Sequence, residues 1–371
     1  MKAQTEPTVR GRTNNMQDAP QVLLPLVGQC RRGAYTPSRE VYNMSVPVIG
    51  TDRKPLMPTT ASRARCWIKN NEAVPFFKRG IFCVKLIREP SANEKQKIAV
   101  GIDPGSKKEG FTVKSTAHTY LNIQADAIQH VGKTVEIRRN MRRNRRYRKT
   151  PYRQNRMNRA HGALPPSTKS RWQWKLRIIE QLAKIFPITD FVVEDIKTKI
   201  GSKLFSPLQI GKDWFYTQLK LFGSVHLKQG WETAELRNKF GLRKTTDKLA
   251  SVFEAHCVDS WVLANSFTGY HMYPDNTRMI YITPIILHRR QLHMRQPSKG
   301  GIRKSYGGTR SIDFKRGSLV SHYKYGLSYI GGTRVGRISL HSLIDGRRIC
   351  CNAKPSDLQF KAYNIWRVVY D

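Results

Sequence analysis

The strongest constraint on the fold comes from residues 97–130, where three runs rich in β-forming residues follow one another. The first run, IAVGI, is apolar, and DPGS and KKEG supply turn sequences nearby. An amphipathic helix sequence, RWQWKLRIIEQLAKIF at 171–186, comes later and precedes another apolar strand sequence, ITDFVVEDIKT at 188–198. Three strands in meander order, then helices and a further buried strand, predict an α/β sheet.

The charge of the chain indicates a polyanionic partner. Its 371 residues include 66 Lys and Arg against 26 Asp and Glu, a formal net charge of +40. Such a protein gains affinity for nucleic acid by releasing counter-ions from phosphates, whatever the base sequence. A ribosomal protein would have the same property, so the charge alone does not distinguish an enzyme from a structural protein. Hydrophobic residues make up 39% of the chain, which is enough for buried cores and excludes a wholly disordered basic tail.

The cysteines and the hydropathy indicate a cytoplasmic protein. The six cysteines are scattered, and none forms a C-x-x-C pair, which argues against a disulfide framework and against a zinc ribbon. No apolar run approaches the roughly 18 to 20 residues that a membrane-spanning helix needs. We therefore expect reduced thiols, no membrane partner and a cytoplasmic location.

Two carboxylates lie where apolar strands end. Asp103 follows IAVGI and precedes Pro104 and Gly105, so it should be exposed at the edge of the sheet, where a metal ion could reach it. An acid in this position can also simply cap a turn. Glu194 ends the run FVVE, and Asp195 beside it should point to the opposite face because side chains alternate along a strand. We prefer Glu194 of the two, a choice that the family resemblance given below supports.

A histidine and an aspartate form the third element of the candidate site. His256 and Asp259, in HCVD, are three residues apart on a helix expected from about Thr246 to Phe267, so they share one face. Alone, such a pair could be a surface hydrogen bond. Together with Asp103 and Glu194 they form the oxygen-rich set that two Mg²⁺ ions require, with Mn²⁺ as a substitute. We expect the three carboxylates to bind metal, and His256 to act as a general base or to orient the attacking water.

A second signal is a segment dense in arginine. Between residues 138 and 159 there are eleven Lys and Arg and no acid. Arginine binds phosphates in bidentate geometry, so this segment should order against a nucleic-acid backbone, although a solvated basic helix remains the alternative. The residues expected to contact the nucleic acid, which the resemblance given below implies is a guide RNA, are Arg138, Arg139, Arg142, Arg143, Arg145, Arg146, Arg148, Arg153 and Arg156.

With these motifs in order, the chain resembles the IsrB family, compact transposon-encoded relatives of IscB and of the type II CRISPR effector nucleases. KPLMP, at Lys54–Pro58, resembles the motif that names the family's N-terminal domain. GIDPGS, VVED and HCVD resemble the three RuvC motifs, and this resemblance places the catalytic residues at Asp103, Glu194, His256 and Asp259. The Arg-rich segment falls where the bridge helix of the family, which grips the guide RNA, should lie. The resemblance extends from about residue 44 to the C-terminus.

The resemblance implies an α/β fold with an RNase H-like (RuvC) nuclease core, an Arg-rich bridge helix, a small N-terminal α+β (PLMP) domain and a β-rich C-terminal domain. The expected boundaries are a flexible extension at 1–43, the PLMP domain at 44–92, RuvC part I at 93–132, the bridge helix at 133–163, RuvC parts II and III at 164–268, and a domain that reads a target-adjacent motif at 269–371.

The resemblance also implies a function. IscB carries an HNH nuclease domain between the second and third RuvC motifs, but here about sixty residues separate Glu194 from His256, and the only histidine between them is His226. An HNH centre needs a pair of histidines, so the resemblance implies a nickase that uses an omega-type guide RNA to pair with double-stranded DNA and cuts the displaced, non-target strand. The protein would be a monomer within its ribonucleoprotein. The alternatives are a guide-independent RuvC-type structure-specific nuclease and a catalytically silent RNA- or DNA-binding protein.

Overall fold

The computed structural model describes residues 45–90, 94–149, 164–195, 207–269, 271–285, 295–296, 301–302 and 309–371. The chain divides into two compact units, residues 1–38 and residues 39–371. Everything described here belongs to the second unit. The extension expected at 1–43 therefore lies outside the described residues, as do Arg153 and Arg156.

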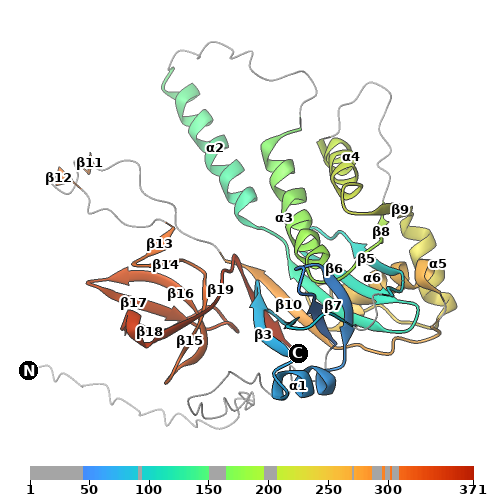
Figure 1. The fold of residues 1–371 in the computed structure, drawn as a ribbon. Coiled ribbons are helices and arrows are strands. Elements are labelled where there is room, and N and C mark those ends of the chain that lie inside the picture. Colours follow the sequence, from blue (N-terminus) through green and yellow to red (C-terminus); the bar gives the residue numbers. More distant parts are fainter. Residues whose placement is uncertain are drawn as a thin grey trace, which may run out of the picture. The chain divides into compact units, whose positions relative to one another are not determined.

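The N-terminal module is a four-stranded sheet with one helix (Figure 1). The strand order is β2-β1-β4-β3, and β1 is parallel to β4. The helix begins after Thr60, whose hydroxyl accepts a hydrogen bond from the backbone N–H of Arg63 at 3.3 Å, as expected of an N-cap. The helix ends at Lys69, and the apolar residues from Ala73 onward form a strand. The elements are β1 (Val46–Ile49), β2 (Pro55–Thr59), α1 (Ala61–Lys69), β3 (Ala73–Lys78) and β4 (Ile81–Leu86).

A seven-stranded sheet forms the centre of the fold, with strand order β20-β10-β7-β6-β5-β8-β9. The three β-rich runs predicted from the sequence are β5, β6 and β7, joined as an antiparallel meander, and β8 is parallel to β5. The order β7-β6-β5-β8-β9, with only β6 antiparallel to the rest, is that of an RNase H-like core. The strands are β5 (Ile98–Asp103), β6 (Lys108–Ser115), β7 (Thr119–Asp126), β8 (Asp190–Glu194), β9 (Ser224–Lys228), β10 (Met279–Pro284) and β20 (Trp366–Tyr370).

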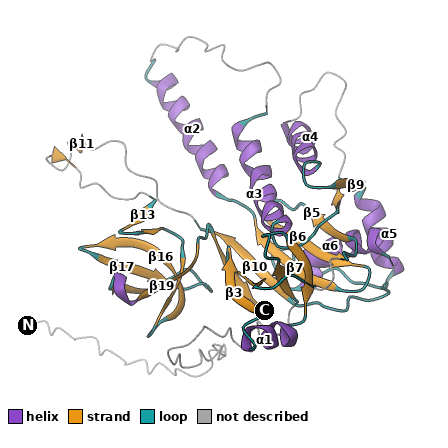
Figure 2. Cartoon of the chain, viewed as in Figure 1, coloured by secondary structure: helices purple, strands orange, loops and turns teal. Residues whose placement is uncertain are grey.

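Helices pack on both faces of this sheet (Figure 2). Helix α6 crosses β5 and β6 very closely, since a Cβ at Gly101 would overlap the carbonyl oxygen of Ser260, and one at Gly110 would overlap that of His256. Aromatic residues join two of the other helices, with the rings of Trp172 and Phe215 5.0 Å apart. The helices are α3 (Pro166–Ala183), α4 (Pro207–Leu219), α5 (Gly230–Lys239) and α6 (Phe253–Thr268).

Helix α6 starts later than the sequence suggested. The prediction of a start near Thr246 was wrong, because α6 begins at Phe253 and residues 240–252 form a loop. Two side chains explain the difference. The hydroxyl of Thr245 accepts a hydrogen bond from the N–H of Asp247, and the carboxylate of Asp247 accepts one from the N–H of Leu249 at 2.8 Å. Such local bonds satisfy backbone donors outside a helix and compete with helix formation.

The C-terminal part is β-rich, as expected, but it is not separate from the central sheet. Its first and last long strands, β10 and β20, pair with each other and extend that sheet beyond β7. The Trp366 indole donates to the carbonyl of Arg79 at 2.8 Å, which joins β20 to the N-terminal module. Between them lies a five-stranded sheet of β15 (Leu319–His322), β16 (Gly326–Arg334), β17 (Arg337–His341), β18 (Arg348–Ala353) and β19 (Leu358–Ala362). None of the described helices is both long and apolar enough to cross a membrane.

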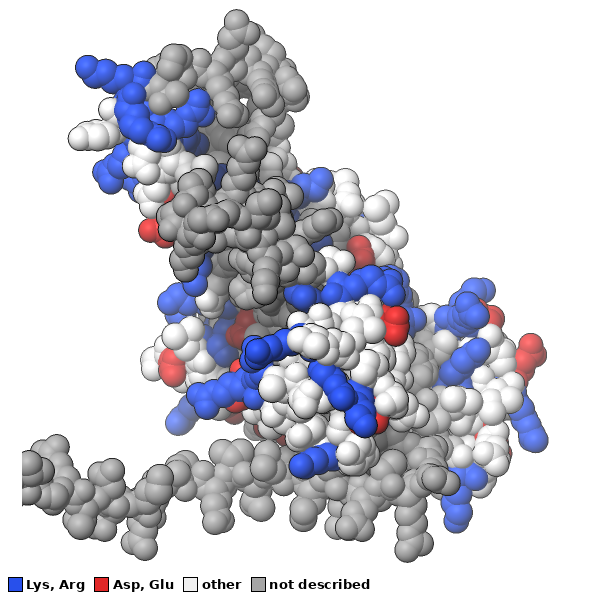
Figure 3. Space-filling model, turned by 90° about the vertical axis from the view of Figure 1, so that its left-hand side faces the viewer, with Lys and Arg blue, Asp and Glu red and all other residues white. Residues whose placement is uncertain are grey.

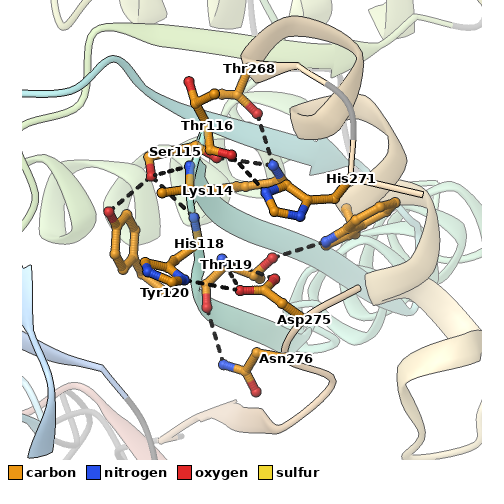
Figure 4. A network of polar contacts seen from close by, with 12 residues as sticks. Lys114, Ser115, Thr116, His118, Thr119, Tyr120, Thr268, His271, Asp275 and Asn276 are labelled. Atoms are coloured by element: carbon orange, nitrogen blue, oxygen red, sulfur yellow. Dashed lines mark hydrogen bonds and ion pairs between the residues drawn. The ribbon is translucent and has the colours of Figure 1, made fainter. Parts of the chain in front are cut away.

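A polar network holds the hairpin end of β6 and β7, at the opposite end of β6 from Asp103 (Figure 4). Asp275 accepts the backbone N–H of Thr119 at 3.0 Å, and the buried ammonium of Lys114 donates to the hydroxyl of Thr268. Burial lowers the pKa of Lys114 to about 8, although the charge of Asp275 opposes this shift. These contacts tie the hairpin to the end of α6 and to the segment that follows it.

Candidate active site

The Asp103 side chain lies at the end of β5, on the face of the sheet that α6 covers. Its partner across the antiparallel pair is Gly110, whose missing side chain leaves room for the helix. Asp103 is 7% exposed, and its Oδ2 lies 2.9 Å from Nδ1 of His256. The sequence predicted that a strand would deliver this carboxylate to the sheet edge. The expectation that it would be exposed there was wrong, because α6 packs over this end of β5 and buries the side chain.

Both ring nitrogens of His256 face oxygen acceptors. Nδ1 contacts the Asp103 carboxylate, and Nε2 lies 3.1 Å from the backbone carbonyl of Lys248. A carbonyl can only accept, so Nε2 carries a hydrogen, and an ionised carboxylate likewise requires one on Nδ1. Burial lowers the pKa of His256, but the hydrogen bond and charge of Asp103 outweigh it and raise the pKa overall. In this arrangement both ring nitrogens are placed to donate, which favours the protonated form of His256.

Glu194 ends β8, the strand next to β5, and faces the same cluster. Burial raises its pKa to about 7, and the charge of Asp103, a hydrogen bond with Asp103 and the charge of Asp259 add to this effect. A hydrogen bond between two carboxyl groups needs a proton from one of them. Glu194 and Asp103 are therefore close enough to share a proton, as expected of carboxylates that crowd one site.

Asp259 completes the cluster from α6, one turn after His256. It is 2% exposed, and two cations occupy its two oxygens. Nη1 of Arg237, on α5, donates to Oδ1 at 2.6 Å, and the ammonium of Lys244, in the loop before α6, donates to Oδ2. Buried carboxylates need such partners, since an unpaired buried charge is strongly destabilising.

The structure thus brings all four predicted residues to one place, from β5, β8 and α6. We use the name carboxylate cluster for Asp103, Glu194 and Asp259. Arg237 and Lys244 were missed, because a chain with 66 Lys and Arg offers no local signal that separates two of them from the rest. Arg237 contacts the site from α5, and Lys244 contacts it from the loop between α5 and α6, part of which the sequence predicted to be helix.

Asp195 lies in a different environment from its neighbour Glu194. Its Oδ1 accepts from the ammonium of Lys212 at 2.9 Å and from the hydroxyl of Tyr216 at 3.0 Å, both on α4. Burial and the charge of Asp195 raise the pKa of Tyr216, so this hydroxyl stays protonated and donates. The expectation that Asp195 points away from Glu194 is confirmed. Its contacts anchor α4 to the end of the strand that carries Glu194.

The three carboxylates of the cluster are suitable ligands for a divalent metal ion, although they are not arranged around a single metal position. Within the described residues, no group of three or more His, Cys, Asp and Glu side chains is arranged to hold a metal ion. Instead the three carboxylates interact with one ammonium, that of Lys244. Clustered carboxylate oxygens are the ligands that Mg²⁺ and Mn²⁺ prefer, and a cation already stands among them.

Helix α2 (His130–Tyr147) covers the first part of the range 133–163 that was predicted for the bridge helix, and residues 150–163 of that range lie outside the described residues. Val131 is its buried residue, and the arginines on it are exposed except for the half-buried Arg145. Among the described residues no salt bridge joins these arginines to an acid. Figure 3 shows Lys and Arg side chains predominating over Asp and Glu on the face in view. The six predicted arginines on α2 are Arg138, Arg139, Arg142, Arg143, Arg145 and Arg146, and Arg148 follows its end.

A known family matches the first part of the described chain. Residues 46–204 match the family model of the RRXRR protein. Two solved structures match part of the chain. RuvC from T. thermophilus, in complex with a Holliday junction substrate, matches with 14% identity and a TM-score of 0.26, over 45% of this chain and 90% of that one. The yeast mitochondrial Holliday junction resolvase Ydc2 matches with 10% identity and a TM-score of 0.25, over 48% and 80%. No curated protein matches the sequence.

Proposed function

We propose that this protein is an RNA-guided, metal-dependent DNA endonuclease that nicks the non-target strand. The observation that carries the proposal is the convergence of Asp103, Glu194, His256 and Asp259 at one end of an RNase H-like sheet. Burial and the neighbouring carboxylates Asp103 and Asp259 raise the pKa of Glu194 to about 7, a shift of the kind found at functional sites. Structural ion-pair networks also shift pKa values, so this proposal is tested by activity.

The carboxylate cluster would hold Mg²⁺, or Mn²⁺ in its place. A pair of such ions supplies activation of the attacking water and stabilisation of the leaving oxygen of a phosphodiester. The protein's own contribution is to hold the ligands in place. Asp103 is fixed by β5 and its contact with His256, Glu194 by β8, and Asp259 by the first half of α6. His256 holds a proton at Nδ1 that it must give up before it can act as a base.

Helix α2 supports binding of a guide RNA. An isolated helix whose residues are almost all exposed gains little stability from its own packing. Besides its arginines it exposes Ile137 and Met141, at 59% and 62%, which lie one turn apart. Arginines that have no acidic partner are available to phosphates, and the exposed apolar side chains are available to bases. We propose that α2 binds the backbone of the guide RNA, as the resemblance to IsrB proteins implies.

The segment between Glu194 and His256 supports cutting of one strand. Its described part consists of α4, β9 and α5, and β9 pairs with β8 as the edge of the nuclease sheet. His226, on β9, forms a hydrogen bond with Asp190 at 3.0 Å and packs against the ring of Phe267, so it serves the fold. These elements belong to the nuclease core, and a second nuclease domain is not needed to explain them.

The decisive experiment is strand-resolved cleavage of a supercoiled plasmid that carries a guide-matched target. The protein is co-expressed with its flanking non-coding RNA and assayed with Mg²⁺ and with EDTA. Guide- and Mg²⁺-dependent nicking of the non-target strand is the expected result. Cleavage without the guide would instead favour a structure-specific RuvC-type nuclease, and a purified protein with RNA but without cleavage would favour a silent binding protein.

A further inference from the structure

The loop of residues 240–252, between α5 and α6, brings a cation into the carboxylate cluster. The Lys244 ammonium donates to Oδ2 of Asp259, and its charge also interacts with Asp103 and Glu194. Burial opposes the charged form of Lys244, but the three carboxylates outweigh burial and raise its pKa. One positive charge therefore faces all three candidate metal ligands.

We propose that the Lys244 ammonium is a resident counter-ion of the carboxylate cluster, which a divalent metal ion must displace in order to bind. The inference rests on the proposed metal-dependent function, and it assigns a role to a residue outside the predicted ligand set. Like charges that are crowded at a buried site repel one another. In the chain without metal, Lys244 relieves this repulsion among the carboxylates, as His256 does beside Asp103.

Lys244 is placed to leave the cluster when a stronger cation arrives. Its side chain is 29% exposed, against 2% for Asp259, so it lies between the buried carboxylate and solvent. A lysine ammonium is a strongly hydrated point charge on a flexible stem, so water can solvate it once it leaves Asp259. Arg237 remains on Oδ1 of Asp259 from a helix, so Asp259 keeps one partner during the exchange.

The loop itself need not unfold for this exchange. Its second half is tied to the sheet by contacts that do not involve Lys244. The Gln124 amide donates to the carbonyl of Ala250 at 2.9 Å, and the Tyr281 hydroxyl donates to that of Ser251 at 2.7 Å. The carbonyl of Lys248 accepts from His256. Only the Lys244 side chain must therefore move, and the affinity for metal reflects competition between this ammonium and the divalent ion.

The test measures Mn²⁺ binding by electron paramagnetic resonance titration of the full-length protein, without nucleic acid. Lys244→Met removes the competing charge and should tighten Mn²⁺ binding by at least about tenfold. Lys244→Arg, which keeps the charge, should bind Mn²⁺ like the wild type. The matched control is Arg243→Met, which removes one charge from the neighbouring exposed residue and should change the affinity much less. Thermal unfolding in EDTA establishes that each variant is folded.

The outcomes separate the inference from the proposed function. If Lys244→Met binds Mn²⁺ no more tightly than Arg243→Met, Lys244 is a structural partner of Asp259 and the inference fails. If no variant shows Mn²⁺ binding that Asp103→Asn abolishes, the metal centre itself is wrong, and the proposed function fails with it. Should Lys244→Met not fold, Lys244→Gln provides the same comparison, because it keeps a hydrogen-bond donor and loses the charge.

Discussion

The ammonium of Lys175, on α3, lies 2.5 Å from Oε1 of Glu109, on β6, and this ion pair is almost completely buried. Lys175 also donates to the carbonyl of Gly105, two residues after Asp103, at 3.3 Å. Because Glu109 neighbours Gly110 on β6, its side chain lies on the face of the sheet opposite Asp103. The pair therefore supports the turn that follows Asp103, and it does so from the opposite face of the sheet.

Breaking this pair should destabilise the protein strongly. Burial raises the pKa of Glu109 although the charge of Lys175 and its hydrogen bond oppose the shift, and Oε2 of Glu109 has no partner among the described residues. Lys175→Met leaves the glutamate buried without its counter-charge, which typically costs about 3–5 kcal/mol of unfolding free energy. Urea denaturation followed by circular dichroism measures this loss.

The double variant is the control for this prediction. Lys175→Met combined with Glu109→Leu replaces both charges by apolar groups of similar size, and it should recover most of the missing stability. A double variant as unstable as Lys175→Met alone would mean that packing around α3, and not the unpaired charge, causes the loss.

Asp103→Asn should abolish nicking while RNA and DNA binding persist. The substitution keeps the size of the side chain but removes a charged metal ligand. Losing a residue that only supports a metal ligand costs up to roughly 100-fold, so losing the ligand itself should lower the nicking rate by more than that. Single-turnover nicking and a filter-binding assay measure the two properties. Asp195→Asn is the comparison, since Asp195 pairs with Lys212 and Tyr216 and should affect stability more than chemistry. Nicking retained in Asp103→Asn would remove this residue from the reaction.

The raised pKa of Glu194 predicts a pH-dependent loss of stability without metal. In the folded chain its pKa is about 7, and in the unfolded chain it is about 4.3. The folded state therefore binds the proton more tightly, so this stabilisation is complete below about pH 4.3 and is lost as the pH rises through about 7. Glu194→Gln cannot ionise and escapes the loss. In EDTA its Tm should exceed that of the wild type increasingly between about pH 5 and about pH 8, and an equal difference at both would contradict the assignment.

The sequence predicted the candidate site better than its surroundings. Each of the four residues follows from a short motif, because strand ends and helical spacing place side chains by local rules. The start of α6 was wrong because Thr245 and Asp247 bond to nearby backbone donors, an effect that hydrophobic periodicity does not show. The residues around the site depend on tertiary contacts instead. Lys244 and Asp259 are fifteen residues apart in the sequence and meet only because the loop before α6 folds back.

The sheet was predicted only in its central part. The meander of β5, β6 and β7 and the strand β8 are adjacent to turn signals or helices that mark them. Strands β10 and β20 join the same sheet from positions 279 and 366, with a separate five-stranded sheet between them. Pairing between strands so far apart in the chain has no local signal in the sequence. The resemblance implied a single C-terminal domain from residue 269.

Neutralising the exposed arginines of α2 should weaken RNA binding and reduce its dependence on salt. For single-stranded nucleic acid, each phosphate that a cation no longer neutralises lowers the slope of log K against log salt by about 0.7, so four such phosphates would lower it by about 3. Binding of the flanking RNA, measured by fluorescence anisotropy across a series of salt concentrations, gives the slope. A control with four exposed cations replaced elsewhere should change it much less, and equal slopes in the two variants would mean that α2 adds only general charge. The variants replace Arg139, Arg142, Arg143 and Arg146 on α2, or Lys69, Arg88, Lys95 and Lys97 outside it, each by Gln.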